Sequence, residues 1–203
     1  MTIEKGVPWG KPGALPADGA IVRSDAEIRS IVQRCRRDNL RLPSIGLLGG
    51  DLCRTLGGTG DEDRLRSHAA MRFAVDIGMA LVDGRIHWFV AHLIARRSWW
   101  RGRTLAVMNA QWLGHWDLGP RAHPGDGLLD ITDADLDLGD RLKARRRLPT
   151  GTHLPHPAIT TRRVSAWHTD FEPSLDVWLD GTKIGRGRTL AIRVEPSALT
   201  VVI

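Results

Sequence analysis

The residues most suggestive of chemistry are two glycines followed by an acidic side chain. Gly49-Gly50-Asp51 separates an apolar run, Ile45 to Leu48, from a short helical pattern that begins at Asp51. Backbone N–H groups at a helix start can bind a phosphate, and glycine lets a ligand approach the backbone closely. Glycines also serve purely structural strand-to-helix turns. The segment is therefore a candidate phosphate site, with a structural turn as the alternative.

A second candidate group is acidic and precedes a basic stretch: Asp126, Asp130, Asp133, Asp135 and Asp137. Carboxylate oxygens suit a hard divalent cation. Turns and helix caps use aspartate equally well, and those roles are the simpler interpretation. His153 and His156 have a spacing that invites a zinc interpretation, but no cysteine or third ligand lies nearby. We therefore predict no metal site.

Tryptophan and arginine are interleaved between Arg96 and Arg103, where Trp99 and Trp100 stand among four arginines. Tryptophan favours the membrane interface and arginine attracts anionic headgroups, so the stretch could contact a lipid surface. The alternative is a loop whose tryptophans cover the core. Stacking on single-stranded nucleic acid is unlikely here, because no nucleic-acid motif accompanies the stretch. A second basic run, Arg141 to Arg147, is typical of a solvated helix face.

The elements that would position these residues fall into two groups. Residues 1–19 are rich in glycine and proline and suggest an extended arm. Ser24-Asp25-Ala26-Glu27 is a capping box, and the apolar positions after it repeat with helical spacing. With the strand at Ile45 to Leu48 and the helix after it, residues 20–69 read as a small α/β lobe.

Residues 70–203 have a different pattern of short apolar runs separated by Gly, Pro and Asp turns. Predicted strands are Met71 to Val82, Ile86 to Ile94, Thr104 to Ala110, Leu128 to Ile131, Thr160 to His168, Leu175 to Leu179, Leu190 to Val194 and Leu199 to Ile203. Such a series predicts an antiparallel β-sandwich. One helix, at about 137–148, interrupts it. The predicted fold class is α+β.

Three groups of short motifs follow one another along the chain: Asp51-x-x-Arg54-x-Leu56-Gly57; Asn109 with Pro120-x-Ala122 and Asp126-Gly127-Leu128-Leu129-Asp130; and Leu175-x-Val177-x-Leu179-Asp180-Gly181 with Arg193-Val194-x-Pro196-x-Ala198-Leu199. In order and spacing they resemble the diacylglycerol kinase family of lipid kinases, which includes sphingosine and ceramide kinases and is related to NAD kinases. The resemblance runs from about residue 20 to residue 203.

The resemblance implies an α/β nucleotide lobe, a β-sandwich lobe and an active site between them. Members of the family phosphorylate a lipid hydroxyl with ATP and Mg²⁺. Carried onto this sequence, the family motifs imply nucleotide contacts at Asp25, Gly49, Gly50, Asp51 and Arg54. They imply catalytic roles for Asp126 and Asp180.

The chain departs from the family at several of these motifs. The family's Gly-Gly-Asp-Gly-Thr loop is represented by Arg23-Ser24-Asp25-Ala26-Glu27, in which only Asp25 matches. The family's Pro-x-Gly-Thr stretch ahead of Asp51 is shortened. A late Leu-Asp-Gly-Glu motif ends in Thr182 here, and a threonine hydroxyl cannot act as a base near pH 7. The catalytic set is therefore depleted.

Two hypotheses of different class follow. The chain is a non-catalytic or weakly active relative that binds a lipid, a nucleotide or a protein, or it is a minimal ATP-dependent lipid kinase. A shortened lobe would expose sheet edges and apolar surface, so we expect a homodimer or a partner chain to cover it. Light scattering that shows a strict monomer would count against this. We expect a cytoplasmic protein that can rest on a membrane.

Composition agrees with a folded protein and gives a weak hint about partners. Apolar residues make up 42% of the 203, which excludes a disordered chain. The net charge is +6, and because four of the 29 basic residues are lysines, 25 are arginines. That balance favours phosphate-bearing partners, although a GC-rich genome alone would also produce it. Two cysteines are too few for a disulfide framework.

Overall fold

A computed structural model describes residues 9–203, so the first eight residues of the predicted arm lie outside the described part. The helices are α1 (Asp25–Arg37), α2 (Asp51–Thr55), α3 (Glu62–Leu65) and α4 (Leu138–Arg147), which leads into a 3-10 turn, η1 (Leu148–Thr150). The strands are β1 (Lys11–Pro12), β2 (Ala20–Val22), β3 (Ile45–Leu47), β4 (Met71–Val82), β5 (Arg85–Phe89), β6 (His92–Arg96), β7 (Thr104–Met108), β8 (Trp112–Leu113), β9 (Trp116–Asp117), β10 (Leu129–Ala134), β11 (Ile159–Val164), β12 (Ala166–Leu179) and β13 (Thr182–Val202).

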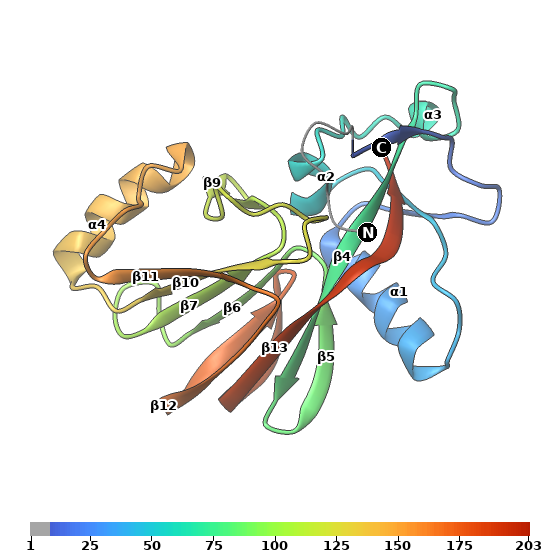
Figure 1. The fold of residues 1–203 in the computed structure, drawn as a ribbon. Coiled ribbons are helices and arrows are strands. Elements are labelled where there is room, and N and C mark those ends of the chain that lie inside the picture. Colours follow the sequence, from blue (N-terminus) through green and yellow to red (C-terminus); the bar gives the residue numbers. More distant parts are fainter. Residues whose placement is uncertain (1–8) are drawn as a thin grey trace.

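The N-terminal lobe forms around the parallel strands β2 and β3 and the end of β13 (Figure 1). The predicted capping box is confirmed, because the Ser24 side chain accepts a hydrogen bond from the Glu27 backbone N–H at the start of α1. The apolar stripe of α1 places Ile28 and Val32 in a buried core with Ile45 and Leu52. Burial of that stripe holds α1 against the small sheet.

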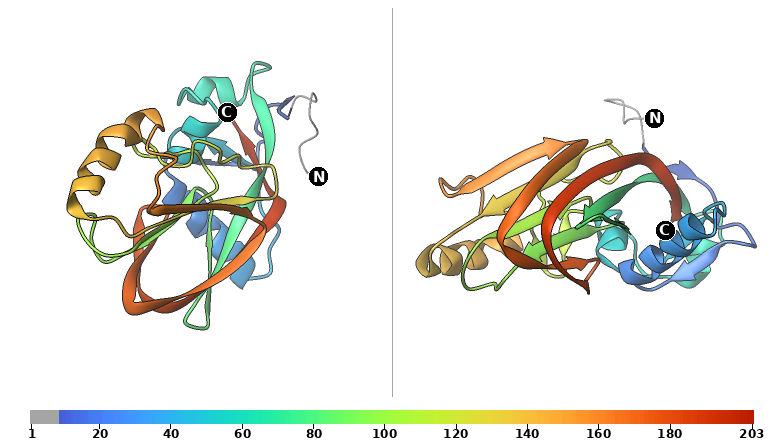
Figure 2. Two further views of the ribbon diagram at one scale, coloured as in Figure 1. Left: turned by 60° about the vertical axis from the view of Figure 1, so that its left-hand side comes forward. Right: turned by 90° about the horizontal axis from the view of Figure 1, so that it is seen from below.

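Two long antiparallel strands, β4 and β13, run through both lobes (Figure 2). Their register shifts between Glu195 and Leu199, so a bulge bends β13 between its two halves. The part of β13 after the bulge contributes to the N-terminal core, together with the part of β4 that pairs with it. The part of β13 before the bulge and its partner segment of β4 contribute to a larger core with β6, β7, β10 and β12. The lobes therefore share strands instead of being joined by a linker.

The C-terminal lobe is mostly antiparallel sheet, in the order β4-β13-β12-β6-β7-β10-β11. This confirms the α+β class with an antiparallel second lobe. Sequence analysis joined Ile86 to Ile94 as one strand, but the chain breaks into β5 and β6 at Val90–Ala91. The predicted strands at 190–194 and 199–203 are instead one strand, β13, interrupted by the bulge.

Helix α4 confirms the interruption predicted near 137–148, and Asp137 caps it by accepting a hydrogen bond from the Asp140 backbone N–H. It lies across one face of the sheet formed by β6, β7 and β10 (Figure 1). A separate apolar cluster forms here, with Ile94, Ala106, Met108 and Leu148 buried. Among the described residues no helix is long and apolar enough to cross a membrane.

The described part of the predicted arm is extended and packed against the protein. Lys11 and Pro12 pair with the start of β4, and the Leu15 backbone N–H donates to the Leu65 carbonyl. Leu15 is buried in a small cluster with Leu65.

Candidate functional site

The predicted glycine turn meets Asp25 directly. Both oxygens of the Asp25 carboxylate accept backbone hydrogen bonds from the start of α2, one from Asp51 at 2.6 Å and one from Leu52 at 3.2 Å. A Cβ on Gly50 would lie 2.5 Å from an Asp25 oxygen, and a Cβ on Gly49 would lie 2.5 Å from the Arg23 carbonyl oxygen. The two glycines are therefore needed so that the α1 and α2 starts can approach each other.

Asp51 extends this group toward the sheet. One of its carboxylate oxygens lies 3.0 Å from Nε2 of His92, and the other accepts the Gly114 backbone N–H at 2.9 Å. Arg54 donates to the Gly114 carbonyl at 2.6 Å and lies over the Trp112 ring, 3.6 Å from its centroid. Asp51 and Arg54 thus attach the β8–β9 hairpin to α2.

Asp180 lies behind His92 and is also buried. Its carboxylate accepts hydrogen bonds from the backbone N–H groups of Val90, Ala91 and His92 at 2.9–3.1 Å. These are the donors left without strand partners where β5 ends and β6 begins. Asp180 therefore stabilises the break that turns His92 toward Asp51.

Burial makes two acidic side chains of this group, Asp25 and Asp180, difficult to ionise. It raises the pKa of Asp25 to about 7, an effect that the charge of Asp180 adds to and the backbone donors of Asp51 and Leu52 oppose. Burial also raises the pKa of Asp180. For His92, burial lowers the pKa, but its hydrogen bond to Asp51 and the nearby carboxylates outweigh that and raise it.

Asp25, Asp51 and His92 are a possible cation site, because each can bring a ligand atom within 4.8 Å of the others. The set does not fit the Mg²⁺ of lipid kinases. Mg²⁺ prefers oxygen ligands in an octahedron, whereas one of these three groups is an imidazole. Both oxygens of Asp25 are also already accepting backbone hydrogen bonds.

The predicted phosphate contacts are also occupied by the protein itself. The Asp25 carboxylate takes the first donors of α2, and a Glu27 carboxylate oxygen accepts the Arg23 backbone N–H at 3.0 Å ahead of α1. The first donors of α2 are therefore taken by an acidic side chain where a phosphate would bind. These residues do not fit the triphosphate of ATP in the arrangement observed.

Asp126 does not join this group. It forms an ion pair with Arg163 and accepts the Leu128 backbone N–H at 2.9 Å. Arg163 also faces Asp130, with Nε 3.4 Å from a carboxylate oxygen. The structure thus brings Asp25, Asp51 and Asp180 together and places Asp126 in an ion-pair network beside β10 and β11.

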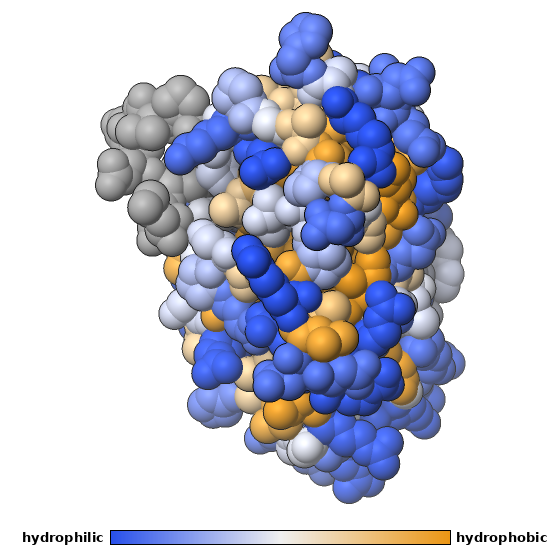
Figure 3. All heavy atoms as spheres, turned by 90° about the vertical axis from the view of Figure 1, so that its right-hand side faces the viewer, coloured by the Kyte–Doolittle hydropathy of each residue, from blue (hydrophilic) through white to orange (hydrophobic). Residues whose placement is uncertain are grey.

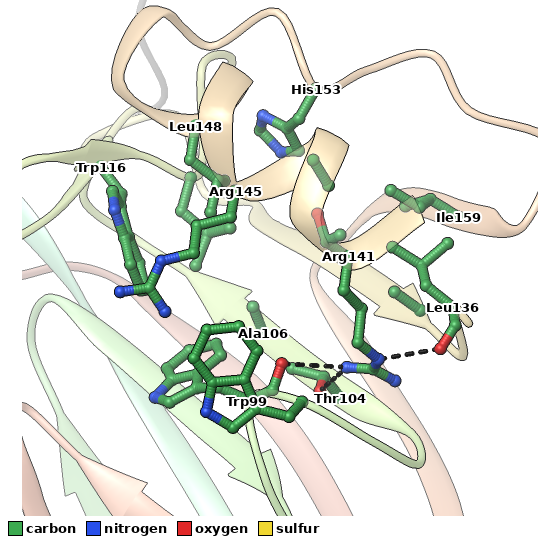
Figure 4. Close-up of a pocket in the computed structure, with 15 residues that line it drawn as sticks. Trp99, Thr104, Ala106, Trp116, Leu136, Arg141, Arg145, Leu148, His153 and Ile159 are labelled. Carbon is green, nitrogen blue, oxygen red and sulfur yellow. Dashed lines mark hydrogen bonds between the residues drawn. The ribbon is translucent and has the colours of Figure 1, made fainter. Parts of the chain in front are cut away.

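A second candidate site is an apolar pocket between α4 and the sheet (Figure 4). It contains about 680 Å³ of space, including the part open to solvent. Three tryptophans contribute to its wall, together with small and aliphatic residues of the sheet and of α4: Trp99, Trp100, Trp116, Ala106, Leu118, Leu136, Ala144, Leu148 and Ile159.

Few polar groups enter this pocket. Arg141 is buried against its floor and donates from Nε to the Leu136 carbonyl at 2.8 Å (Figure 4). The basic run Arg141 to Arg147 therefore lies on a solvated helix face except for Arg141, which is buried. Arg145 lies over Trp100 and Trp116, with its Cζ 5.0 and 5.3 Å from the two ring centroids. Neither ring nitrogen of His153 has a hydrogen-bond partner among the described residues.

The position of His92 could not be predicted from the sequence. It lies inside the strand predicted over Ile86 to Ile94, and nothing in the local pattern shows that the strand breaks at Val90. The signal that could have found it is Asp180, a buried acid that must receive donors from somewhere in the fold.

Comparisons with known proteins agree with this architecture. Residues 63–203 match the model of the YegS C-terminal NAD kinase beta sandwich-like domain. Three solved structures of proteins from Bacillus anthracis str. Sterne have TM-scores of 0.68, 0.66 and 0.65 to this chain at 15% identity, covering 91% of this chain and 77% of the other. They are described as diacylglycerol kinases, two of them provisionally.

Comparison with the curated proteins found no match. The structural likeness at 15% identity establishes the fold, while the domain match spans more than half of the sequence. The chain therefore belongs to the family of the YegS C-terminal NAD kinase beta sandwich-like domain, and it shares its fold with the three Bacillus anthracis proteins.

Proposed function

We propose that this protein binds an amphiphilic lipid in the pocket beneath α4 and does not transfer phosphate from ATP. The observation that carries the proposal is the pocket itself, whose wall is apolar and rich in tryptophan. Aliphatic chains gain free energy when they leave water for such a site, at roughly 25 cal/mol for each Å² buried. The lipid-kinase fold of the chain supports a lipid as ligand.

The arrangement of the polar group supports the absence of phosphoryl transfer. The carboxyl group of Asp25 takes the first backbone donors of α2, so a triphosphate could bind there only by displacing it. Thr182 stands where the family has a glutamate and offers no base near neutral pH.

An ATP-dependent lipid kinase is the alternative, and one observation favours it. Asp25 has a pKa of about 7, which is the range suited to proton transfer at neutral pH. In that case ATP and Mg²⁺ would need to displace the bonds between Asp25 and the start of α2. The two functions make opposite predictions for ATP binding.

The test measures both ligands on the purified protein. Tryptophan fluorescence would follow titration with monodecanoylglycerol, because three tryptophans line the pocket. We expect saturable binding that Ala144→Phe abolishes by filling the pocket from α4. Thermal unfolding with millimolar Mg·ATP should show no stabilisation, whereas a bound ligand at a hundredfold excess over Kd would add about 2.7 kcal/mol.

Leu142→Phe is the matched control, since Leu142 lies on α4 but is 43% exposed and does not line the pocket. It should bind the lipid as the parent protein does. Binding that survives Ala144→Phe would contradict the pocket. An ATP-dependent rise in melting temperature that Asp51→Ala removes would support the kinase alternative instead.

The expected partner chain remains a proposal as well. Figure 3 shows apolar patches among charged side chains on the face of the N-terminal lobe. A shallow groove there is lined by Ile21, Val22, Ala26 and Ile31, next to β2, whose described pairing is with β3 alone. A second copy or another protein that covers this edge would remove unpaired strand groups from solvent.

A further inference from the structure

Arg96, near the end of β6, is held in an unusual way. Its guanidinium lies between two indole rings, with Cζ 4.3 Å from the centroid of Trp99 and 4.2 Å from that of Trp178. Stacking on both faces leaves the N–H groups of a guanidinium pointing only outward in its plane. Within residues 9–203 the buried Nε of Arg96 has no acceptor, and the side chain forms no ion pair.

His92 lines the same cavity as Arg96 and lies four residues before it on β6. Its side chain is 3% exposed. Nε2 is held by Asp51, but Nδ1 is buried and without a partner among the described residues. Buried polar atoms normally have partners, so two orphaned nitrogens on one cavity indicate a missing ligand.

The cavity offers about 480 Å³ of space, including the part open to solvent. Apart from Arg96 and His92, its wall is made of aromatic and aliphatic side chains and Gly181. The residues that line the cavity therefore offer the guanidinium no carboxylate, although Asp176 lies opposite Arg96 across the ladder. An anion placed there would gain charge-assisted hydrogen bonds in a partly desolvated site.

The carboxylates near this cavity are already engaged by donors. Asp176 pairs with Lys183 at 3.0 Å and faces Arg186 at 3.5 Å. Asp180 accepts three backbone N–H groups, and Asp51 accepts the Gly114 N–H besides its bond to His92. Their negative charge is therefore partly compensated. Asp176 lies directly opposite Arg96 in the β6–β12 ladder and its charge acts on the guanidinium, but among the described residues no carboxylate forms an ion pair with Arg96.

Trp99 connects this cavity to the α4 pocket, because it lines both. We propose that the Arg96 cavity binds the anionic headgroup, a phosphate monoester or a carboxylate, of the lipid whose chain lies in the α4 pocket. The inference rests on the proposed function, which is lipid binding in the α4 pocket. It adds that the headgroup of the lipid is negatively charged. The ligand is thus an already anionic lipid, bound by Arg96 and His92.

The test compares two ligands with the same chain, decanoyl lysophosphatidate and monodecanoylglycerol, by calorimetric titration at one ionic strength. We expect the anionic lipid to bind at least about tenfold tighter, because its headgroup gains charge-assisted hydrogen bonds in the cavity. Arg96→Met, which keeps an unbranched chain between the two rings, should bring the ratio of the two affinities close to one.

Arg97→Met is the matched control, since it removes the same charge from the next residue, which is exposed and outside the cavity. This variant should keep the preference for the anionic lipid over the neutral lipid. Equal affinity for the two lipids in the parent protein, or a preference that survives Arg96→Met, would overturn the proposal. If neither lipid binds, the proposed function fails with it. If inorganic phosphate alone binds through Arg96 while neither lipid does, the site accepts free anions and the link to a lipid is wrong.

Discussion

Asp25 combines a structural role, the cap of α2, with a strongly raised pKa. It caps α2 from the start of α1, and that position buries its carboxyl group. The cap joins the start of α2 to α1, whose apolar stripe also packs with Leu52. The same burial raises its pKa, so the cap is formed by a group that still holds a proton near neutral pH.

This coupling predicts how stability depends on pH. Because the pKa of Asp25 in the folded protein, about 7, lies above its ordinary value of 3.8, the folded protein binds more protons than the unfolded chain between these two pH values. The stabilisation of the folded state that this raised pKa provides is complete below pH 3.8 and is lost as the pH rises through about 7. We expect the free energy of unfolding to fall with rising pH across this window, and Asp25→Asn to reduce the slope. Urea unfolding at several pH values measures it.

Asp83→Asn provides the control for that measurement. Backbone N–H groups of Thr189 and Arg188 lower the pKa of the exposed Asp83, so its contribution is lost only as the pH falls below 3.8. Its substitution should leave the slope between pH 4 and pH 7 unchanged. An unchanged slope in Asp25→Asn would show that other groups carry the dependence.

Single residues also show how much of the candidate site can be predicted from the sequence alone. Asp25, Asp51 and Asp180 were predicted from motifs, and they do lie together. His92 and Arg96 were not assigned to a site, because their roles depend on the break at Val90 and on the packing of Trp178 from another strand. Such contacts join residues that are distant in sequence and leave no local pattern.

At the scale of elements, the β4–β5 hairpin depends on one glycine. A Cβ on Gly78 would lie 2.1 Å from the Phe89 ring, which is fully buried and directly opposite in the ladder. We expect Gly78→Ala to destabilise the protein by about 1–3 kcal/mol through overpacking. Thermal or urea unfolding measures the change.

The double substitution Gly78→Ala with Phe89→Leu tests the cause. Removing the ring should relieve the clash, so the two changes together should cost less than the sum of their separate costs. Strictly additive costs would show that the alanine acts through the backbone and not through Phe89.

Elements with local signals were predictable, and elements shaped by tertiary pairing were not. The capping box located α1, and Asp137 located the start of α4. By contrast, β12 and β13 are far longer than the apolar runs that predicted them. Their polar stretches stay in the ladder because they pair with each other, as Asp170 does with Thr189. Pairing of that kind cannot be read from one segment.

On the scale of the whole molecule, the outer surface of α4 is suited to an anionic membrane. Leu138 and Leu142 are four residues apart and are 56% and 43% exposed, so both lie on the same solvent-facing side of the helix. Trp100, at the mouth of the pocket, is 49% exposed. Arg145, Arg146 and Arg147 add positive charge to the last turn.

We therefore expect the protein to bind vesicles that contain phosphatidylserine, and to bind neutral vesicles more weakly. Basic residues near an anionic surface contribute about 1 kcal/mol each, and salt screens them. Replacing Leu138 and Leu142 by Glu should reduce binding at least about tenfold, because two apolar contacts are lost and two negative charges are added. Sedimentation with vesicles at two salt concentrations measures both effects.

Leu40→Glu is the control for this surface, since Leu40 is 58% exposed but belongs to the N-terminal lobe. If the membrane is approached through α4, this change should leave vesicle binding almost unaltered. Comparable losses in both variants would mean that binding follows net charge alone. Binding that resists salt and depends on Leu138 and Leu142 would place the pocket mouth at the lipid surface, because Trp100 and Arg145 lie beside the same helix.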